Sequence, residues 1–346
     1  MFRYLAILII VLLNHLPSAW AQWSPQASGV DVQLRGISAV SPKIAWASGA
    51  KGTVLRTLDS GRHWAKITVA DAEGLDFRDI QAFDDKIAYV LSIGPGEQSR
   101  IYKTDDGGQH WQLQFTNHDP KGFYDCFAFW DKNHGMAFSD SVDGVFLLLI
   151  WNGHDWRPLV PQTLPPALPI EGGFAASGTC IAIAGKNDVW FVTGGPAARV
   201  FHSGDHGQNW TVVNSPILSG AATQGIFSIA FSDSTHGVIV GGDYNNPKSQ
   251  EKNAAFTTDG GKSWTLAARC PQGYRSAVTF IPHAPSPTLI SVGTSGSDYS
   301  LDGGGTWLPL DAEDYNAVSF AGPLAGWAVG PKGRIARFTG LPKSSK

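Results

Sequence analysis

The sequence predicts an all-β chain folded as a closed β-propeller of seven blades, and three observations support this prediction. An eight-residue turn motif ending in Trp recurs along the chain, an apolar strand precedes each copy, and the composition is that of a turn-rich protein. The 346 residues include 40 Gly and 13 Trp, but only 16% are charged. Frequent turns and aromatic residues are typical of all-β domains, and repeats of this length indicate stacked or circular sheets.

The turn motif has the form Ser/Thr-x-Asp-x-Gly-x-x-Trp. Full copies span residues 57–64, 104–111, 203–210, 257–264 and 300–307, and residues 152–156 are a shortened copy. The Asp is expected to accept hydrogen bonds from its own turn, and the Gly tolerates positive φ. The Trp is expected to bury its ring in the next strand. We therefore assign a structural role, not a catalytic or metal-binding one, to these residues: Asp59, Trp64, Asp106, Trp111, Asp205, Trp210, Asp259, Trp264, Asp302 and Trp307.

The apolar strands provide the blade count. Seven similar segments begin roughly 37 to 54 residues apart, a spacing typical of four-stranded blades, at Ala45, Ala88, Gly135, Val189, Gly237, Leu289 and Gly326. No turn motif follows the last segment. Residues 22–25 resemble the segment that follows each turn motif, so the mature N-terminal strand is expected to complete the last blade. Closure would leave no exposed sheet edge, and it predicts one domain over residues 22–340 with a short tail at 341–346.

The first 21 residues are expected to be a signal peptide. A positive start at Arg3 precedes an apolar run from Tyr4 to Leu13, and residues 19–21 offer a small-x-small cleavage site. The run is too short to cross a bilayer as a mature helix, although a retained anchor is the alternative. We expect an exported protein, periplasmic or secreted, that does not itself span the membrane after cleavage.

Charge and cysteine content exclude several classes of site. A net charge of −3 argues against a nucleic-acid partner, which would require a basic surface. Cys126, Cys180 and Cys270 allow at most one intrachain disulfide and match no zinc spacing. We expect them to be small buried side chains. No metal site, cofactor motif or catalytic nucleophile is predicted.

The candidate site comes from aligning the innermost strand of each blade. Aligned six-residue runs begin with Arg35, Arg78, Tyr124, Arg275 and Tyr315, which predicts that these side chains surround one mouth of the channel. Guanidinium groups can hold a carboxylate or phosphate through paired hydrogen bonds, so we expect a pocket that prefers anions. The alternative is that the arginines only pair with nearby acids. Further candidates on the same face are Asp125, Glu171, Arg199, Asp243 and Tyr244.

The repeats resemble those of the BNR/Asp-box propellers, within the sialidase-like superfamily. The resemblance is strongest to the branch like the photosystem II stability/assembly factor. Its strand–loop–strand pattern matches Gly326-Trp-Ala-Val-Gly330 followed by Gly333-Arg-Ile-Ala-Arg337. The resemblance covers nearly all of the mature chain and implies a non-catalytic propeller that binds a protein or membrane complex. It is specific for fold rather than activity, because one propeller hosts many functions.

Two other functions remain open. A sialidase-like glycoside hydrolase needs three arginines on a carboxylate, a Tyr nucleophile with a Glu partner, and an Asp acid; Glu171 with Tyr124 or Tyr315 would supply part of this set. However, the Arg-Ile-Pro signature of those enzymes is absent, because Gly36 follows Arg35. An extracellular lectin is the third hypothesis, since aromatic side chains repeated on blades suit sugar stacking. The partner is expected to be a protein, a membrane complex or a small anion.

Overall fold

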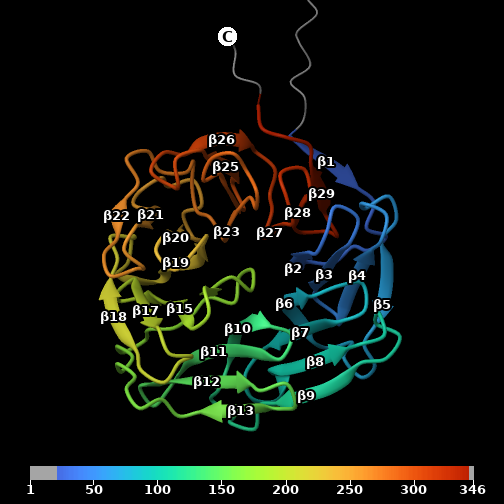
Figure 1. The fold of residues 1–346 in the computed structure, drawn as a ribbon, viewed down its shortest axis with the longest axis horizontal. Helices are drawn as coiled ribbons and strands as arrows, with labels where there is room; N and C mark the ends of the chain where they lie inside the picture. Colours follow the sequence, from blue (N-terminus) through green and yellow to red (C-terminus); the bar gives the residue numbers. More distant parts are fainter. Residues whose placement is uncertain (1–21, 343–346) are drawn as a thin grey trace, which may run out of the picture.

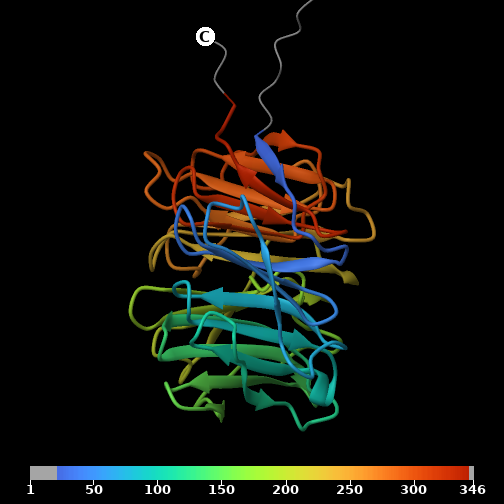
Figure 2. The same cartoon turned by 90° about the vertical axis from the view of Figure 1, so that its right-hand side faces the viewer.

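The computed structural model describes residues 22–342, which form a ring of seven antiparallel sheets around a central channel (Figure 1). Viewed from the side, the ring is a thick disc whose strands lie across it (Figure 2). The predicted all-β fold and the count of seven blades are confirmed. Within residues 22–342, no helix is long and apolar enough to cross a membrane. The predicted signal peptide lies outside the described residues.

Each of the first three blades consists of four strands that follow one another from the channel outward. Blade 1 contains β2 (Leu34–Ala39), β3 (Ala45–Gly49), β4 (Thr53–Thr57) and β5 (Ala65–Thr68). Blade 2 contains β6 (Asp76–Ala82), β7 (Ala88–Ile93), β8 (Arg100–Thr104) and β9 (Gln112–Thr116), with the short 3₁₀ helix η1 (Gly96–Gln98) before β8. Blade 3 contains β10 (Tyr124–Asp131), β11 (His134–Val142), β12 (Val145–Trp151) and β13 (Trp156–Leu159).

The remaining blades follow the same order with two differences. Blade 5 has an extra strand, and the outer strand of blade 7 comes from the first described segment of the chain. Blade 4 contains β14 (Ile181–Ala184), β15 (Asp188–Val192), β17 (Arg199–Ser203) and β18 (Thr211–Asn214). Blade 5 contains β19 (Ala221–Phe231), β20 (Gly237–Asp243), β21 (Ala254–Thr257) and β22 (Thr265–Leu266), and β16 (Gly194–Gly195) adds to β19. Blade 6 contains β23 (Ala277–Phe280), β24 (Leu289–Gly293), β25 (Gly296–Ser300) and β26 (Leu308–Asp311). Blade 7 contains β27 (Ala317–Phe320), β28 (Gly326–Val329), β29 (Ile335–Phe338) and β1 (Trp23–Gln26).

The outer strand of blade 7 therefore comes from the other end of the described chain. β1 pairs antiparallel with β29, with Trp23 opposite Phe338. The Trp23 ring is 3% exposed and lies 5.3 Å from the Phe338 ring, centroid to centroid. The Trp23 indole N–H also donates to Ser297 Oγ of blade 6 at 3.2 Å. The first described strand is thus joined to two blades at the end of the ring.

The hydrophobic core lies between the blades, because each sheet packs its two faces against its neighbours. The second strand of a blade is accordingly apolar on both faces, and all five residues of β3 are buried. Trp46 of β3 packs edge-on against Trp111 of blade 2, with ring centroids 6.4 Å apart. Such a strand reads as a continuous apolar run rather than an alternating one, which is why these segments stand out in the sequence.

The turn motifs join the third and fourth strands of their blades. In the first, Asp59 Oδ1 accepts the His63 backbone N–H at 2.9 Å, while the Thr57 hydroxyl accepts the Gly61 N–H at 2.8 Å. These hydrogen bonds with His63 lower the pKa of Asp59 to about 2. The same backbone bond recurs at Asp106, Asp205, Asp259 and Asp302. Each carboxylate thus closes its own turn.

One expectation about the cysteines is wrong. Cys126 of β10 and Cys180, just before β14, form a disulfide that joins blades 3 and 4. Only Cys270 is a free, partly buried thiol. The sequence allowed one disulfide but did not indicate the pair, because 54 residues separate the two cysteines. Only the ring brings the inner strands of neighbouring blades together.

Candidate binding face at the start of the inner strands

Two arginines reach the channel mouth because each lies at a β-bulge. In blade 1, Leu34 pairs with Gly49 and Gly36 with Ser48, which leaves Arg35 as an extra residue. In blade 2, the pairing skips Arg78 in the same way. A bulge bends the strand locally and redirects the side chain of the extra residue. Both arginines remain partly exposed.

The other members of the predicted ring do not join them, because the alignment of the inner strands was wrong by one residue. In blade 1, Ala39 pairs with Ala45. At the equivalent place in blades 3, 6 and 7, the residues that pair with Gly135, Leu289 and Gly326 are Phe129, Phe280 and Phe320. Side chains alternate along a strand, so a shift of one residue reverses their direction. Tyr124, Arg275 and Tyr315 therefore point into the blades and are buried.

The true equivalents of Arg35 and Arg78 are different residue types. In blade 3 the extra residue at the bulge is Asp125, and in blade 5 it is Phe227. Tyr274, which the sequence analysis did not consider, is buried close to both arginines, and burial raises its pKa. The sequence alignment selected its neighbour Arg275 instead, because Arg275 has the same residue type as Arg35 and Arg78.

Two of the predicted site arginines are held in buried ion pairs. Arg275 donates from Nε to Asp298 Oδ2 at 2.7 Å, and neither side chain is exposed. Arg199 donates from Nε to Glu171 Oε1 at 2.7 Å, and its Nη2 bonds the second oxygen. Arg275 and Arg199 therefore pair with neighbouring acids, which is the alternative that the sequence left open for the arginines. Neither arginine is available to a ligand.

The channel is closed at this end by a segment that we call the plug, Gly172–Thr179. It belongs to the connection between β13 and β14 and reaches into the middle of the ring, where Figure 1 shows it as a yellow-green loop. Arg35 Nη1 donates to the Ala176 carbonyl at 3.2 Å, and Arg78 Nη1 donates to the Ala175 carbonyl at 3.0 Å.

On the other side, the plug is held by blades 5 and 6. The Phe174 ring stacks on Phe227 at a centroid distance of 3.7 Å. Ser177 donates to the Ser276 carbonyl at 2.8 Å. The plug thus contacts blades on opposite sides of the channel. Its contacts are distant in sequence, so no local pattern could have predicted this position.

Two buried carboxyl groups, Asp79 and Asp125, and the half-buried Asp140 line the plug from blades 2 and 3. Asp79 accepts the Phe127 N–H at 2.8 Å, and Asp140 accepts the Gly173 N–H at 2.7 Å. Asp125 is 1% exposed, and its Oδ2 has no hydrogen-bond partner among the described residues. Burial raises the pKa of all three groups, that of Asp140 to about 6. Protonation of these groups is therefore more favourable in the folded protein than in the unfolded chain.

Arg35 and Arg78 remain as the accessible cationic pair. Their main-chain partners are consecutive residues of the plug, so the guanidinium groups lie side by side. Burial, followed by the charge of Arg78, lowers the pKa of Arg35. Arg78 pairs with Asp76 at 2.9 Å, but Arg35 forms no ion pair, and its buried Nε has no hydrogen-bond partner among residues 22–342. Asp243, partly exposed, and Tyr244, 47% exposed, lie on the same face.

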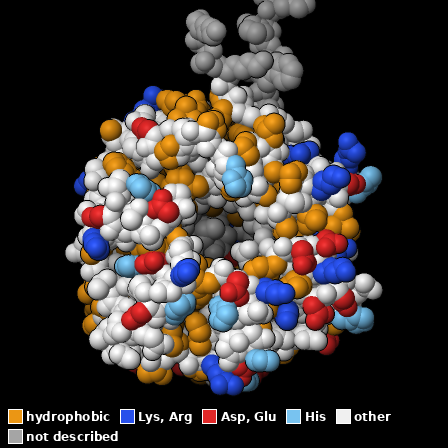
Figure 3. Space-filling view, viewed as in Figure 1, with side chains coloured by type: hydrophobic (Ala, Val, Ile, Leu, Met, Phe, Trp, Pro, Cys, Tyr) orange, Lys and Arg blue, Asp and Glu red, His pale blue; other side chains and the backbone are white. Residues whose placement is uncertain are grey.

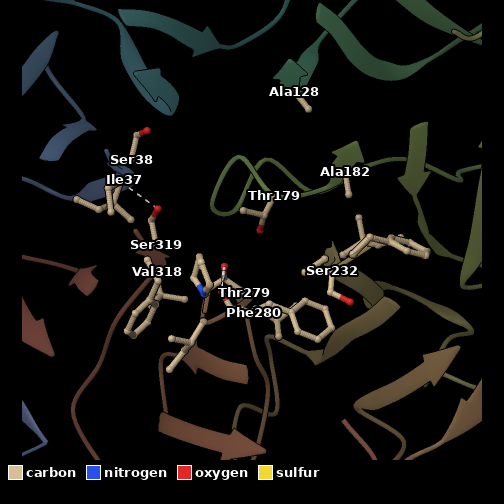
Figure 4. A pocket seen from close by; sticks show the side chains of 18 of the residues that line it. Ile37, Ser38, Ala128, Thr179, Ala182, Ser232, Thr279, Phe280, Val318 and Ser319 are labelled. Atoms are coloured by element: carbon tan, nitrogen blue, oxygen red, sulfur yellow. Dashed lines mark hydrogen bonds between the residues drawn. The ribbon is translucent and has the colours of Figure 1, made fainter. Parts of the chain in front are cut away.

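The opposite end of the channel is open. A cavity of about 930 Å³ lies between the later halves of the inner strands, and the plug residues Ser177–Thr179 form its floor. Figure 3 views this end of the ring, which is hollowed at the centre. Figure 4 shows Thr179 in the middle of the cavity, with Ser38, Ser319 and Thr279 at its wall. The lining is neutral apart from Asp79 and His283.

No metal site is found in the described part of the chain, where no group of three or more His, Cys, Asp or Glu side chains could hold an ion. The chain matches no family model, and no curated protein matches it. Fold and site define a seven-bladed β-propeller whose channel is closed at one end by its own loop.

Two solved structures with this architecture are those of YCF48, a photosystem II assembly factor. The structure of YCF48 bound to a D1 peptide superposes with a TM-score of 0.65 at 16% identity, covering 92% of this chain and 97% of that one. YCF48 from Cyanidioschyzon merolae gives the same TM-score at 18% identity, with 92% and 99% covered. At these identities the similarity shows the fold.

Proposed function

We propose that this protein is an exported, non-catalytic propeller that binds a protein partner, acting as an assembly or stability factor. The partner contributes an acidic group to Arg35 and Arg78. The observation that carries the proposal is the pair of adjacent, partly exposed guanidinium groups, of which Arg35 has no acidic partner. A carboxylate can bind both groups with charge-assisted hydrogen bonds. It would also relieve the repulsion between the two cations.

The structural neighbours support a peptide as the source of that carboxylate. One YCF48 structure contains a D1 peptide, so a propeller of this architecture can hold a peptide. The sequence resemblance to the photosystem II stability/assembly factor-like branch points to the same class of function. We transfer the class of partner, a protein segment, and not its identity.

The residues that the hydrolase hypothesis requires are buried or bonded to other groups in this fold. A sialidase-like site needs three arginines on one carboxylate, but Arg275 is bonded to Asp298 inside blade 6. Glu171 is 3% exposed and bonded to Arg199, while Tyr124 and Tyr315 are buried. The lectin hypothesis weakens too: Trp64, Trp210 and Trp307 are buried, and Trp111 and Trp264 are partly buried.

The test is peptide binding to the purified protein. An array of decapeptides with free C-terminal carboxylates is compared with the same peptides ending in amides. Wild type is expected to prefer the carboxylates, and the double variant Arg35→Gln/Arg78→Gln is expected to bind them about tenfold or more weakly, since losing charge-assisted bonds removes about 1.4 kcal/mol or more. Arg157→Gln is the matched control, because Arg157 is an exposed arginine on β13. Equal binding of acids and amides by both proteins would refute the proposal.

Export is the second part of the proposal. The Cys126–Cys180 disulfide supports it, because disulfides persist in oxidising compartments. Fractionation of the host and N-terminal sequencing of the protein test this point. We expect the protein outside the cytoplasm with a first residue near Gln22. A cytoplasmic protein that retains residues 1–21 would contradict it.

A further inference from the structure

Ile170 has an unusual conformation for its residue type. Its φ is 60° and its side chain lies in the open, with 79% of the residue exposed. The Glu171 N–H donates to the Leu168 carbonyl at 3.1 Å, which closes a turn with Pro169 and Ile170 at its centre. A turn with Pro second and positive φ third normally has Gly or Asn at the third position. A β-branched residue there is strained, and strain of this kind gathers at functional sites.

The Glu171 carboxylate fixes the base of this turn through hydrogen bonds. Glu171 accepts the Leu168 N–H at 2.7 Å through Oε2 and the Thr193 hydroxyl at 2.5 Å through Oε1. The same carboxylate is bonded to Arg199, and the Glu171 side chain is fully buried. The buried ion pair therefore fixes the base of the turn while Ile170 projects outward. Because the backbone of the turn is already fixed, it loses little conformational freedom when a partner covers the Ile170 side chain.

Two more exposed apolar side chains lie beside this turn. Leu168 is 38% exposed, and Val145, the first residue of β12, is 54% exposed. The Ala167 N–H donates to the Gly144 carbonyl at 2.9 Å, which joins the two segments. We call Val145, Leu168 and Ile170 the apolar ridge. Exposed apolar side chains on two segments that are joined in this way indicate an interaction site.

The ridge lies on the same face as the cationic pair. Ala175, which accepts the bond from Arg78, is five residues after Ile170, so their Cα atoms are at most about 18 Å apart. Phe174, packed against Tyr244 at a centroid distance of 6.5 Å, lies between them in sequence. One extended segment of up to about five residues could reach from one site to the other.

We propose that the apolar ridge is a second subsite of the same binding face. It takes one or two large apolar side chains of a protein segment whose carboxylate lies on Arg35 and Arg78. The inference rests on the proposed function and adds the partner's chemistry: an acidic end preceded by apolar residues. A peptide is favoured over a lipid surface, because a propeller of this architecture holds a peptide and one extended segment of about five residues can span both parts of the face.

The experiment compares two sets of carboxylate-ended decapeptides, with Leu and Phe or with Ser and Gly at the third to sixth positions from the end. Wild type is expected to bind the apolar set about tenfold more tightly. Ile170→Gly and Ile170→Asn, which both suit positive φ, are expected to remove this difference while leaving the affinity for the polar set unchanged. Their Tm is expected not to fall, because the substitutions relieve strain. Leu324→Ser is the matched control, because Leu324 is an apolar residue, 60% exposed, in the turn between β27 and β28.

The outcomes separate the two proposals. If wild type binds both peptide sets equally and Ile170→Gly changes nothing, the ridge is not a subsite, whereas a preference for carboxylates over amides would still support the cationic site. If wild type and Arg35→Gln/Arg78→Gln bind the carboxylate and amide forms of the apolar set equally while the apolar preference remains, the cationic site fails and the ridge stands alone. Loss of binding by Ile170→Gly to vesicles of phosphatidylglycerol, with no effect on either peptide set, would assign the ridge to a membrane and overturn the inference.

Discussion

At the scale of single residues, one register position decides whether an arginine lies at the channel mouth or inside a blade. Arg78 is at a bulge and its side chain is 27% exposed, paired with Asp76 in contact with solvent. Arg275 lies one residue away from the equivalent position in its own blade, and it is fully buried and bonded to Asp298. The two residues look equivalent in the sequence but have opposite surroundings.

Substitution should separate the two roles. Arg275→Ala leaves the Asp298 carboxylate buried without its partner, and breaking such a pair costs about 3–5 kcal/mol. Arg78→Ala breaks a partly exposed pair and is expected to cost about 1 kcal/mol or less. Urea unfolding of both variants measures the difference. An Arg275→Ala midpoint as high as that of Arg78→Ala would show that the buried pair contributes little.

The positions of Arg35 and Arg78 were predictable in part. Residue type and repeat alignment indicated a cationic cluster at the start of the inner strands, and these two arginines form it. The bulges at Arg35, Arg78 and Asp125 have no sequence signal, because each lies one or two residues after the start of its strand and too few residues precede it to show the change in alternation. The alignment therefore assigned Tyr124 and not Asp125 to the mouth.

At the scale of elements, local and distant contacts explain what the sequence can and cannot predict. The turn motifs and the apolar second strands depend on hydrogen bonds and burial within a few residues, so their pattern is visible. The plug depends on Arg35, Arg78 and Phe227, which come from blades far apart in the chain. Its sequence indicates only a long, Pro-rich connection.

The plug also predicts a pH dependence. Asp140 accepts the Gly173 N–H, and burial raises its pKa to about 6. The folded protein then binds a proton that the unfolded chain releases near pH 4, so stability falls as pH rises from about 4 to about 6 and stays lower above that. Asp140→Asn keeps the acceptor without the charge. It is expected to gain about 1–3 kcal/mol at pH 7.5 and nothing at pH 4.

Thermal unfolding of wild type and Asp140→Asn across this pH range provides the measurement. Asp131→Asn is the control, because Asp131 is exposed and its pKa is lowered by His134. A gain for Asp140→Asn that is the same at pH 4 and pH 7.5 would mean that the Asp140 carboxyl titrates normally in the folded protein.

At the scale of the whole molecule, one type of hydrogen bond recurs between the inner strands of neighbouring blades. Ser319 of blade 7 accepts the Ala39 N–H of blade 1 at 3.0 Å, and Ser38 of blade 1 accepts the Ala82 N–H of blade 2 at 3.0 Å. Between blades 3 and 4, the Cys126–Cys180 disulfide joins the inner strands. Cys180 lies between the last residue of the plug, Thr179, and the first residue of β14, Ile181, so the disulfide anchors the chain directly after the plug.

Removing that bond tests whether the ring unfolds as one unit. The disulfide closes a loop of 54 residues, which corresponds to about 4 kcal/mol of lost entropy in the unfolded chain. Cys126→Ala/Cys180→Ala should therefore lower Tm substantially, and a reductant should lower the wild-type Tm by a similar amount, while Cys270→Ala has no such effect. Because every blade packs on two neighbours and β1 joins blade 7, we expect calorimetry to show a single transition in each case. A second transition in the double variant would instead mean that blades on either side of the broken link unfold independently.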